Sequence, residues 1–410
     1  MSIAATLAPL DGLLPALEEL YVDLHRHPEL SFAEHRTAGE LARRLRESGY
    51  EVHTGIGKTG VAGVLHNGSG PVVLLRADID ALPVEEHTGL EYASEEHGVM
   101  HACGHDMHAA WLTGAAELLA RAKQSWQGTL LVVFQPGEEQ GSGAERMVQD
   151  GLFDLVGKPN VCLGQHVVPG PAGWVLTRPG VIMAATDALK VVLHGRGGHG
   201  SRPETTVDPA VLAASVVMRL QTVVSREISA TDSAVVTVGS MHVGTAHNVI
   251  ADHAELEINI RTFDDVVRRK VLAAIERIVR GEAVVAGSPE EPEITTIASF
   301  PVTRNDDGAN AQVTEAFQAH FGPDHWMEAP LVTGSEDFSE FARAAGAQSV
   351  FWLVGGLEPQ RVLTAITEGR FEQDIPSNHS SKFAPILHPT LRTGVETLVV
   401  GALRYLDGRA

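Results

Sequence analysis

Three imidazoles, a thiol and a carboxylate lie within eight residues of this chain, in the segment His101-Ala-Cys-Gly-His-Asp-Met-His108. Thiolate and neutral imidazole are the ligands that borderline divalent ions prefer, and each costs desolvation energy when it is buried without a partner. Histidines are also frequent as hydrogen-bonded core or surface residues. This segment alone therefore leaves a metal site and a structural role both open.

Three further segments supply polar side chains of the same kind. They are Gln135-Pro-Gly-Glu-Glu139, Gly164-Gln-His166 and Ser377-Asn-His379. The first two follow apolar runs typical of strands, at residues 130–134 and 161–163. Asp78 and Asp80 follow a third such run at residues 72–76. Because ligand sites of open α/β sheets gather beyond the carboxyl ends of strands, we expect one shared cleft.

The elements that must position these residues alternate between strand and helix. A helical pattern over residues 13–49, broken at His27-Pro28, precedes them. Strands are expected at residues 61–65, 72–76, 130–134 and 161–164, with helices at 108–123 and 144–150. This alternation predicts an α/β domain with a mixed or parallel sheet.

The pattern changes near Pro179-Gly180. Strands are expected at residues 187–194, 233–241, 253–262 and 294–300, with helices at 208–226 and 264–280. The order strand, helix, strand, strand, helix, strand is that of a ferredoxin-like domain. After residue 300 the first pattern returns and ends in a helix at 390–405. We therefore expect a catalytic domain of residues 1–183 and 299–410, with a smaller domain, residues 184–298, inserted into it.

Composition narrows the class of protein. The chain has 410 residues and a formal net charge of −21, from 52 acidic and 31 basic residues without a Lys/Arg block, which argues against nucleic acid or an anionic membrane as partner. Residues 1–20 lack a basic leader, and we find no apolar stretch of about 18 residues. Two cysteines, Cys103 and Cys162, are too few for a disulfide framework. A soluble, cytoplasmic protein is expected.

Taken in order, seven motifs carry a specific resemblance. They are Asp23-Leu-His-Arg-His-Pro-Glu-Leu30, Arg76-Ala-Asp-Ile-Asp-Ala-Leu-Pro83, Gly98-Val-Met-His-Ala-Cys-Gly-His-Asp106, Gln135-Pro-Gly-Glu-Glu139, Gly195-Arg-Gly-Gly-His-Gly200, Asn248-Val-Ile250 and Gly334-Ser-Glu-Asp-Phe338. Over nearly its whole length the chain resembles the metal-dependent aminoacylase and carboxypeptidase-like amidohydrolases. It looks most similar to their branch of hippurate hydrolases, N-acyl-amino-acid amidohydrolases and indole-acetyl-amino-acid hydrolases.

The resemblance implies a zinc-peptidase-like α/β catalytic domain, an inserted ferredoxin-like lid and dimerisation domain, and two divalent ions. The implied ligands are Cys103, His105, Glu139, His166 and His379, with Cys103 bridging the ions. Mixed sulfur, nitrogen and oxygen ligation permits zinc, manganese, cobalt or nickel. A homodimer through the inserted domain, or a higher oligomer, is expected.

Glu138 is expected to be the general base, because adjacent side chains diverge and Glu139 can bind metal while Glu138 faces water. The family usually has a histidine ligand where this chain has Asp78, so Asp78 is not expected to coordinate. Asp80 is expected to hold a ligand imidazole by its other nitrogen. Asp106, His101 and His108 are expected to form hydrogen bonds rather than coordinate, and His25 to be structural or solvated.

Within the inserted domain, the resemblance suggests that His199 approaches the tetrahedral oxyanion, from its own or the partner subunit. Asn248 and Arg261 would hold the substrate carboxylate, a task that suits the planar guanidinium fork. A surface salt bridge is the alternative role for Arg261.

These residues favour hydrolysis of an N-acyl or N-aroyl amino acid to a carboxylic acid and a free amino acid. A metallo-dipeptidase or carboxypeptidase-type exopeptidase would use the same ligands and is the alternative. A binding protein without turnover and a zinc-dependent oxidoreductase are also considered. The intact set Glu138, Glu139, Cys103 and His379 argues against a binding protein. The lack of a Gly-x-Gly-x-x-Gly turn between a strand and a helix argues against an oxidoreductase.

Overall fold

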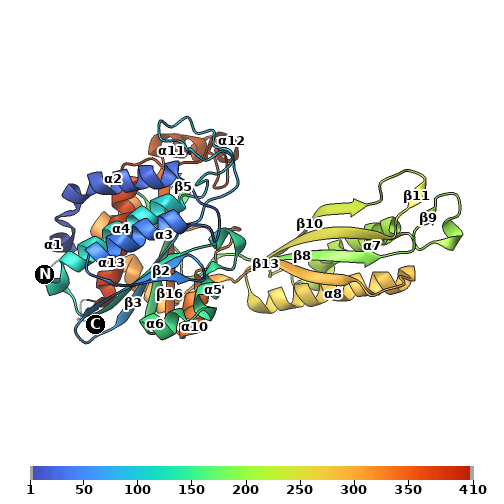
Figure 1. Ribbon diagram of the computed structural model, residues 1–410, viewed down its shortest axis with the longest axis horizontal. Coiled ribbons are helices and arrows are strands. Elements are labelled where there is room, and N and C mark those ends of the chain that lie inside the picture. Colours follow the sequence, from blue (N-terminus) through green and yellow to red (C-terminus); the bar gives the residue numbers. More distant parts are fainter. Residues whose placement is uncertain (1–2, 407–410) are drawn as a thin grey trace. The chain divides into compact units, whose positions relative to one another are not determined.

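A computed structural model describes residues 3–406, which form two compact units (Figure 1). Unit 1 contains the chain up to Ile182, Arg304–Pro330 and the chain from Asp337 onward. Unit 2 contains Met183–Thr303 and Leu331–Glu336. Unit 2 thus begins at residue 183 and ends its main segment at 303, against the expected 184 and 298, and it also takes in a short return segment.

Unit 1 is built on an eight-stranded mixed sheet of order β1-β2-β4-β3-β5-β16-β6-β15. Its central strands β4, β3, β5 and β16 run parallel, and their apolar runs are buried because helices cover both faces. The mixed α/β architecture expected from the sequence is confirmed. The strands are β1 Glu51–Ile56, β2 Gly60–Asn67, β3 Val72–Asp78, β4 Gly128–Gln135, β5 Val161–Pro171, β6 Val175–Thr177, β15 Trp326–Glu328 and β16 Gln348–Leu357.

Helices pack on both faces of this sheet (Figure 1). One face carries α2 Leu10–Arg26, α3 His35–Glu47, α4 His105–Arg121, α9 Asp307–Phe321 and α13 Thr390–Leu406. The other carries α5 Gly143–Gln149, α6 Leu152–Val156 and α10 Ser339–Ala345. Further helices and strands outside these two groups are α1 Ile3–Leu7, α11 Pro359–Thr367, α12 Phe371–Asp374, β7 Gly180–Met183 and β14 Thr303–Asn305. Among residues 3–406, no helix has the length and apolar content needed to cross a bilayer.

Two boundaries in unit 1 differ from expectation and bear on the site. Helix α4 begins at His105 rather than at His108, so His105 lies in its first turn. Strand β5 continues to Pro171 instead of ending at Gly164, because β16 pairs with it beyond that point. His166 therefore lies within the strand, opposite Leu353, and not in a loop after it.

Unit 2 is a four-stranded antiparallel sheet of order β10-β12-β8-β13, with α7 and α8 packed on one face. This is the strand order of a ferredoxin-like βαββαβ domain, so the expected insert fold is confirmed. Asp208 caps α7 by accepting a hydrogen bond from the Ala210 amide at 2.8 Å. The elements are β8 Ala185–His194, α7 Pro209–Thr222, β10 Ala234–Val243, β12 His253–Thr262, α8 Asp265–Ala286 and β13 Glu293–Phe300.

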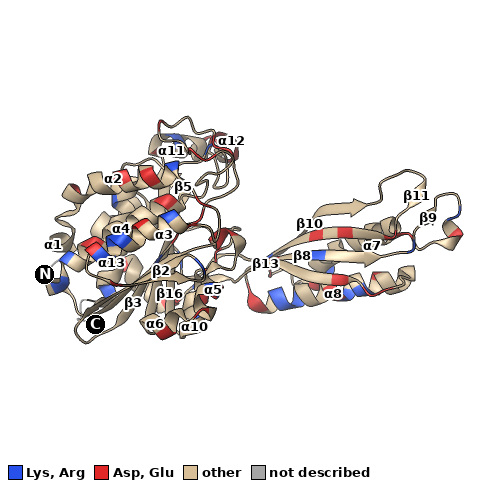
Figure 2. Ribbon diagram, viewed as in Figure 1, with Lys and Arg blue, Asp and Glu red and all other residues tan. Residues whose placement is uncertain are grey.

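Acidic and basic residues are interspersed along both units (Figure 2). The acidic excess is therefore distributed over both units.

Candidate metal centre

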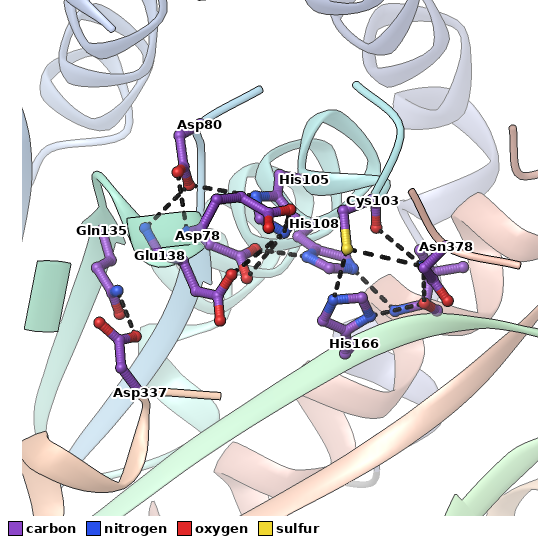
Figure 3. A network of polar contacts seen from close by, with 12 residues as sticks. Asp78, Asp80, Cys103, His105, His108, Gln135, Glu138, His166, Asp337 and Asn378 are labelled. Carbon is purple, nitrogen blue, oxygen red and sulfur yellow. Dashed lines mark hydrogen bonds and ion pairs between the residues drawn. The ribbon is translucent and has the colours of Figure 1, made fainter. Parts of the chain in front are cut away.

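The five side chains implied as metal ligands come together in unit 1, although they are spread over residues 103–379 of the chain. Cys103 Sγ lies 3.4 Å from His166 Nε2 (Figure 3). Glu139 Oε1 lies 3.8 Å from His105 Nε2 and 3.3 Å from His379 Nε2. The ligand atoms of Cys103, His105 and Glu139 are all within 4.8 Å of one another.

Two of the imidazoles are oriented through Nδ1. His105 Nδ1 is 3.3 Å from Asp80 Oδ1, and His166 Nδ1 donates to the Val167 carbonyl at 2.6 Å. A proton on Nδ1 leaves the lone pair on Nε2, and in both rings Nε2 faces the cluster. Partners of this kind fix the tautomer of a metal-ligating histidine.

The donor atoms fit a divalent ion. Within residues 3–406, the buried atoms His105 Nε2 and Glu139 Oε1 form no hydrogen bond, although each has polar neighbours within 4 Å. Buried polar atoms without a partner are rare in folded proteins, and several that converge on one point are the pattern of ligands around an ion. Thiol, imidazole and carboxylate together suit zinc, manganese, cobalt or nickel.

Electrostatics within the cluster also favours a bound cation. Burial and then Glu139 and Glu138 raise the pKa of the Cys103 thiol well above its usual value. Burial lowers the pKa of His105, but Asp78 and Asp80 outweigh this effect and raise it to about 10. The carboxylates thus disfavour further negative charge and attract positive charge. A bound cation would act in the opposite direction on the thiol and stabilise the thiolate.

His108 is not free to bind metal. Its Nδ1 lies 2.5 Å from Asp78 Oδ1, and its Nε2 accepts a hydrogen bond from the Val167 amide at 2.8 Å. Asp78, His105, His108 and His166 offer ligand atoms within 4.8 Å of one another, but both ring nitrogens of His108 are already used. Asp78 also binds Arg76 at 2.9 Å.

Asp106 and His101 take different roles. Asp106 accepts from the Met107 amide at 2.8 Å and lies 2.6 Å from His25 Nδ1, so it forms hydrogen bonds as expected. The nitrogens of His101, by contrast, have no hydrogen-bond partner within residues 3–406. The expectation that His101 forms hydrogen bonds was therefore wrong as far as partners within residues 3–406 are concerned. Burial lowers the pKa of His101 to about 4, which keeps the ring neutral.

The Cys103–His105 turn is held against β5 by Gly104. This residue has φ +80°, and a Cβ added to it would lie 2.3 Å from Val167 Cγ1. Only glycine allows both the left-handed backbone and this close approach. The approach brings Cys103 within reach of His166 on β5.

The loop carrying His379 is fastened to the same turn. His379 has φ +70°, an uncommon conformation for a non-glycine residue, and its amide donates to the Ala102 carbonyl at 2.8 Å. Asn378 Nδ2 donates to the carbonyls of Cys103 at 3.4 Å and Val167 at 3.3 Å (Figure 3). Sequence reasoning gave Asn378 no role, because its position in the Ser377–His379 motif does not show what its amide contacts.

Asp80 connects the imidazole to the glutamate pair. Its two carboxylate oxygens accept hydrogen bonds from the amides of Glu138 and Glu139, each at 3.1 Å, in addition to contacting His105. The side chains of the two glutamates are nearly buried, and Glu138 Oε2 lies 4.0 Å from His105 Nε2. Asp80 therefore fixes the two glutamates and one imidazole relative to one another.

A buried ion-pair network next to Asp78 was not anticipated from the sequence. Arg76, 1 % exposed, donates to Gln135 at 2.8 Å and Asp78 at 2.9 Å and lies 3.3 Å from Asp337. Gln135 and Asp337 are hydrogen-bonded to each other (Figure 3). An arginine inside an apolar strand run was the available signal, because a buried guanidinium requires anionic partners.

The three residues expected in the inserted domain do not converge within unit 2. His199 lies in the small ribbon formed by β9 Gly198–His199 and β11 Val249–Ile250, and Asn248 directly precedes β11. The Gly200 amide donates to the Asn248 carbonyl at 2.8 Å. Arg261 lies near the opposite end of β12, where it donates to Thr333, Ser335 and Asn259.

The separation follows from strand geometry. The nine residues of β12 from His253 to Arg261 span about 26 Å, because each of the eight steps between them rises about 3.3 Å. Asn248 and Arg261 of one chain therefore lie too far apart to bind the same carboxylate. Arg261 is half-buried and bound to a carbonyl, a hydroxyl and an amide oxygen of unit 2 rather than to a surface carboxylate.

Comparison with known proteins agrees with this geometry. Residues 74–368 match the family described as peptidase family M20/M25/M40. The chain is 40% identical over 328 residues to a hippurate hydrolase of Campylobacter jejuni, covering 79% of this chain and 84% of the relative. It is 37% identical over 366 residues to thermostable carboxypeptidase 1 of Saccharolobus solfataricus, covering 88% of each.

A solved structure is similar over almost the full length. It is the YXEP protein of Bacillus subtilis, described as a dinuclear metal-binding peptidase of the M20 family, with a TM-score of 0.76 and 30% identity over 97% of this chain and 100% of that one. Sequence and fold agree, and this chain is a hydrolase that belongs to peptidase family M20/M25/M40.

Proposed function

We propose that this protein hydrolyses the amide bond of N-acyl or N-aroyl amino acids and releases a carboxylic acid and a free amino acid. The observation that supports the proposal most directly is the convergence of the side chains of Cys103, His105, Glu139, His166 and His379. Among their atoms, the buried His105 Nε2 and Glu139 Oε1 form no hydrogen bond within residues 3–406. The similarity to a hippurate hydrolase supports the substrate class.

The five side chains would hold two divalent ions, with Cys103 shared between them. Cys103 suits a bridging role because it lies beside His166 and also within the group formed with His105 and Glu139. When bound in such a site, divalent ions polarise a carbonyl and lower the pKa of water toward neutrality.

The residues of the chain would divide the remaining work. Glu138 would take a proton from the attacking water and deliver it to the leaving nitrogen, which makes it the general base and then the general acid. Asp80 would hold Glu138, Glu139 and His105 in fixed positions relative to one another through its three contacts with them. His199 would donate a hydrogen bond to the tetrahedral oxyanion, while Asn248 and Arg261 would bind the substrate carboxylate.

A homodimer would allow Asn248 and Arg261 to act on one substrate, since the two residues of a single chain are far apart. Within residues 3–406, β10 is an edge strand that pairs on one side only. Helix α7, which contacts β10, exposes Val211 and Met218 at 68% and 72%. Such an edge with apolar neighbours suits pairing with a second copy.

The experiment is an amidase assay with metal removal and a substrate panel. We expect activity on benzoyl-glycine or acetyl-amino acids, loss of activity after thorough chelation, and recovery with zinc, manganese, cobalt or nickel. Activity that survives chelation with no bound metal would refute the mechanism. The carboxypeptidase among the relatives makes peptide cleavage the second candidate. Faster turnover of simple dipeptides than of every acyl-amino acid would favour that activity instead.

A further inference from the structure

A buried carboxylate outside the proposed ligand set contacts the turn that leads into Glu138. Glu34, fully buried, places one oxygen, Oε1, between two backbone amides: it accepts from Phe32 at 2.8 Å and from Gly137 at 3.0 Å. Its other oxygen accepts a hydrogen bond from the Thr59 hydroxyl. Glu34 thus joins residue 32 to Gly137, the residue directly before Glu138.

Phe32 is held in an unusual conformation at the same place. Its φ is +63°, which is strained for a bulky side chain. The ring packs so closely on Gly137 that a Cβ there would lie 2.3 Å from Phe32 Cζ. Arg146 stacks over this ring at 4.3 Å, and Lys58 lies 5.1 Å from its centre. A strained residue persists only when its surroundings stabilise it, and here the surroundings are the turn that leads into Glu138.

The same segment reaches the turn by a second route. Ser31 donates to Asp80 Oδ2 at 2.7 Å, and Asp80 accepts the amides of Glu138 and Glu139. All three consecutive amides of residues 137–139 are therefore bound by two carboxylates that residues 31–34 either supply or orient.

We infer that Glu34 is a positioning residue for the Glu138–Glu139 pair, and that residues 31–34 fix the geometry of this turn. The effect on turnover rests on the proposed function, whereas the effect on the turn itself does not. Glu34 does not touch the ligand atoms, so it acts through the backbone of Gly137. Misplacing a reacting group by about 1 Å can reduce a rate by about 10²-fold, so loss of this contact should be measurable.

The test compares three variants of the full chain. Glu34→Ala removes both oxygens. Glu34→Gln keeps an acceptor for the two amides and can donate to Thr59. Glu29→Ala is the matched control, because Glu29 accepts two α3 amides, from Arg36 and Thr37, at 2.9 and 2.8 Å but does not contact the turn. Each is measured by amide hydrogen exchange of residues 136–140, zinc affinity, and kcat and KM on benzoyl-glycine.

We expect Glu34→Ala to speed exchange at residues 137–139, weaken zinc binding through Glu139, and lower kcat by about 10- to 100-fold with KM changed less than about threefold. Glu34→Gln should restore most of each property, and Glu29→Ala should lower only thermal stability. A folded Glu34→Ala protein with unchanged exchange at residues 137–139 would overturn the inference.

Two further outcomes are separated by design. If the unmodified protein hydrolyses no acyl-amino acid, the proposed function fails, and exchange and zinc affinity still decide the role of Glu34. If Glu34→Ala does not fold, Thr59→Val removes only the contact to the second oxygen. Faster exchange of the Gly137 amide in that variant supports the inference, and unchanged exchange contradicts it.

Discussion

At the scale of single residues, the site depends on which nitrogen of each histidine is already in use. His105 and His166 use Nδ1 for a hydrogen bond and leave Nε2 facing the cluster, whereas His108 uses both nitrogens. The three rings are close together, yet only His105 and His166 have an Nε2 atom that faces the cluster and could take a metal ion. The hydrogen bonds of each ring therefore separate a ligand from a structural histidine.

The adjacent glutamates give the sharpest prediction at this scale. Glu138→Gln should retain its metal and lower kcat by about 10²- to 10⁴-fold, because the amide cannot accept the proton from water. Glu139→Gln should instead lose bound metal, because a carboxylate ligand is removed. Metal content by atomic spectrometry, measured beside kcat, checks both.

Glu145→Gln serves as the control, since Glu145 lies on α5 and contacts Gln149. It should leave both properties unchanged. Near-normal turnover of Glu138→Gln would show that another residue is the base.

At the scale of elements, a second buried charge cluster connects helix α2 to helix α4. His25 on α2 lies 2.6 Å from Asp106 in the first turn of α4 and 3.2 Å from Glu86. Both neighbours are carboxylates, so both ring nitrogens donate and the imidazole is positively charged. Burial lowers the pKa of His25, but the two hydrogen bonds outweigh this effect and raise it to about 9. The sequence alone had left His25 as structural or solvated.

This arrangement predicts a pH-dependent contribution to stability. Because the folded pKa of about 9 lies above the ordinary value of 6.5, the contribution is fully present below pH 6.5 and is lost as the pH rises through 9. Its size is on the order of 3 kcal/mol, since one pKa unit corresponds to about 1.4 kcal/mol. The Tm of the unmodified protein should exceed that of His25→Gln by a constant amount below pH 6.5, and this difference should shrink toward pH 9.

The metal-loaded protein is used for both measurements, so that the ligand histidines do not titrate in this range. A Tm difference that stays constant from pH 6 to pH 9.5 would contradict a charged His25.

At the scale of the whole molecule, the two units have separate tasks. Unit 1 brings together every proposed metal ligand and the proposed base. Unit 2 carries His199 and Asn248 at one end of its sheet and Arg261 at the other. A substrate carboxylate that needs both Asn248 and Arg261 therefore requires two chains.

Mixing two inactive variants tests this requirement. Asn248→Ala and Arg261→Ala homodimers should each bind substrate poorly. After dissociation and reassociation, about a quarter of wild-type activity should return, because half of the dimers are mixed and each mixed dimer has one intact site.

Activity is measured before and after reassortment, with each variant reassorted alone as a control. If the two residues act within one chain, no mixed dimer has an intact site, and the activity should not rise.

The sequence alone predicts the fold class and the ferredoxin-like insert, and the resemblance of its motifs to a known family names the five candidate ligands. These depend on local information: apolar periodicity, the residues at strand ends, and motifs such as the one from His101 to His108. The sequence also gives the expectation that Glu138 is the base and Glu139 the ligand, because adjacent side chains diverge.

Folding fixes which ligand atoms form no hydrogen bond within residues 3–406 and which contacts hold the ligand side chains in place. Several of these contacts join segments that are far apart along the chain. They are the hydrogen bond from the Val167 amide to His108, the hydrogen bond from Asn378 to the Val167 carbonyl, and the hydrogen bond from the Gly137 amide to Glu34. The distance between Asn248 and Arg261 likewise depends on how the strands of unit 2 are arranged. Chain spacing does not encode these distances. They are fixed only when packing brings the sheet, helices and loops to within hydrogen-bonding range.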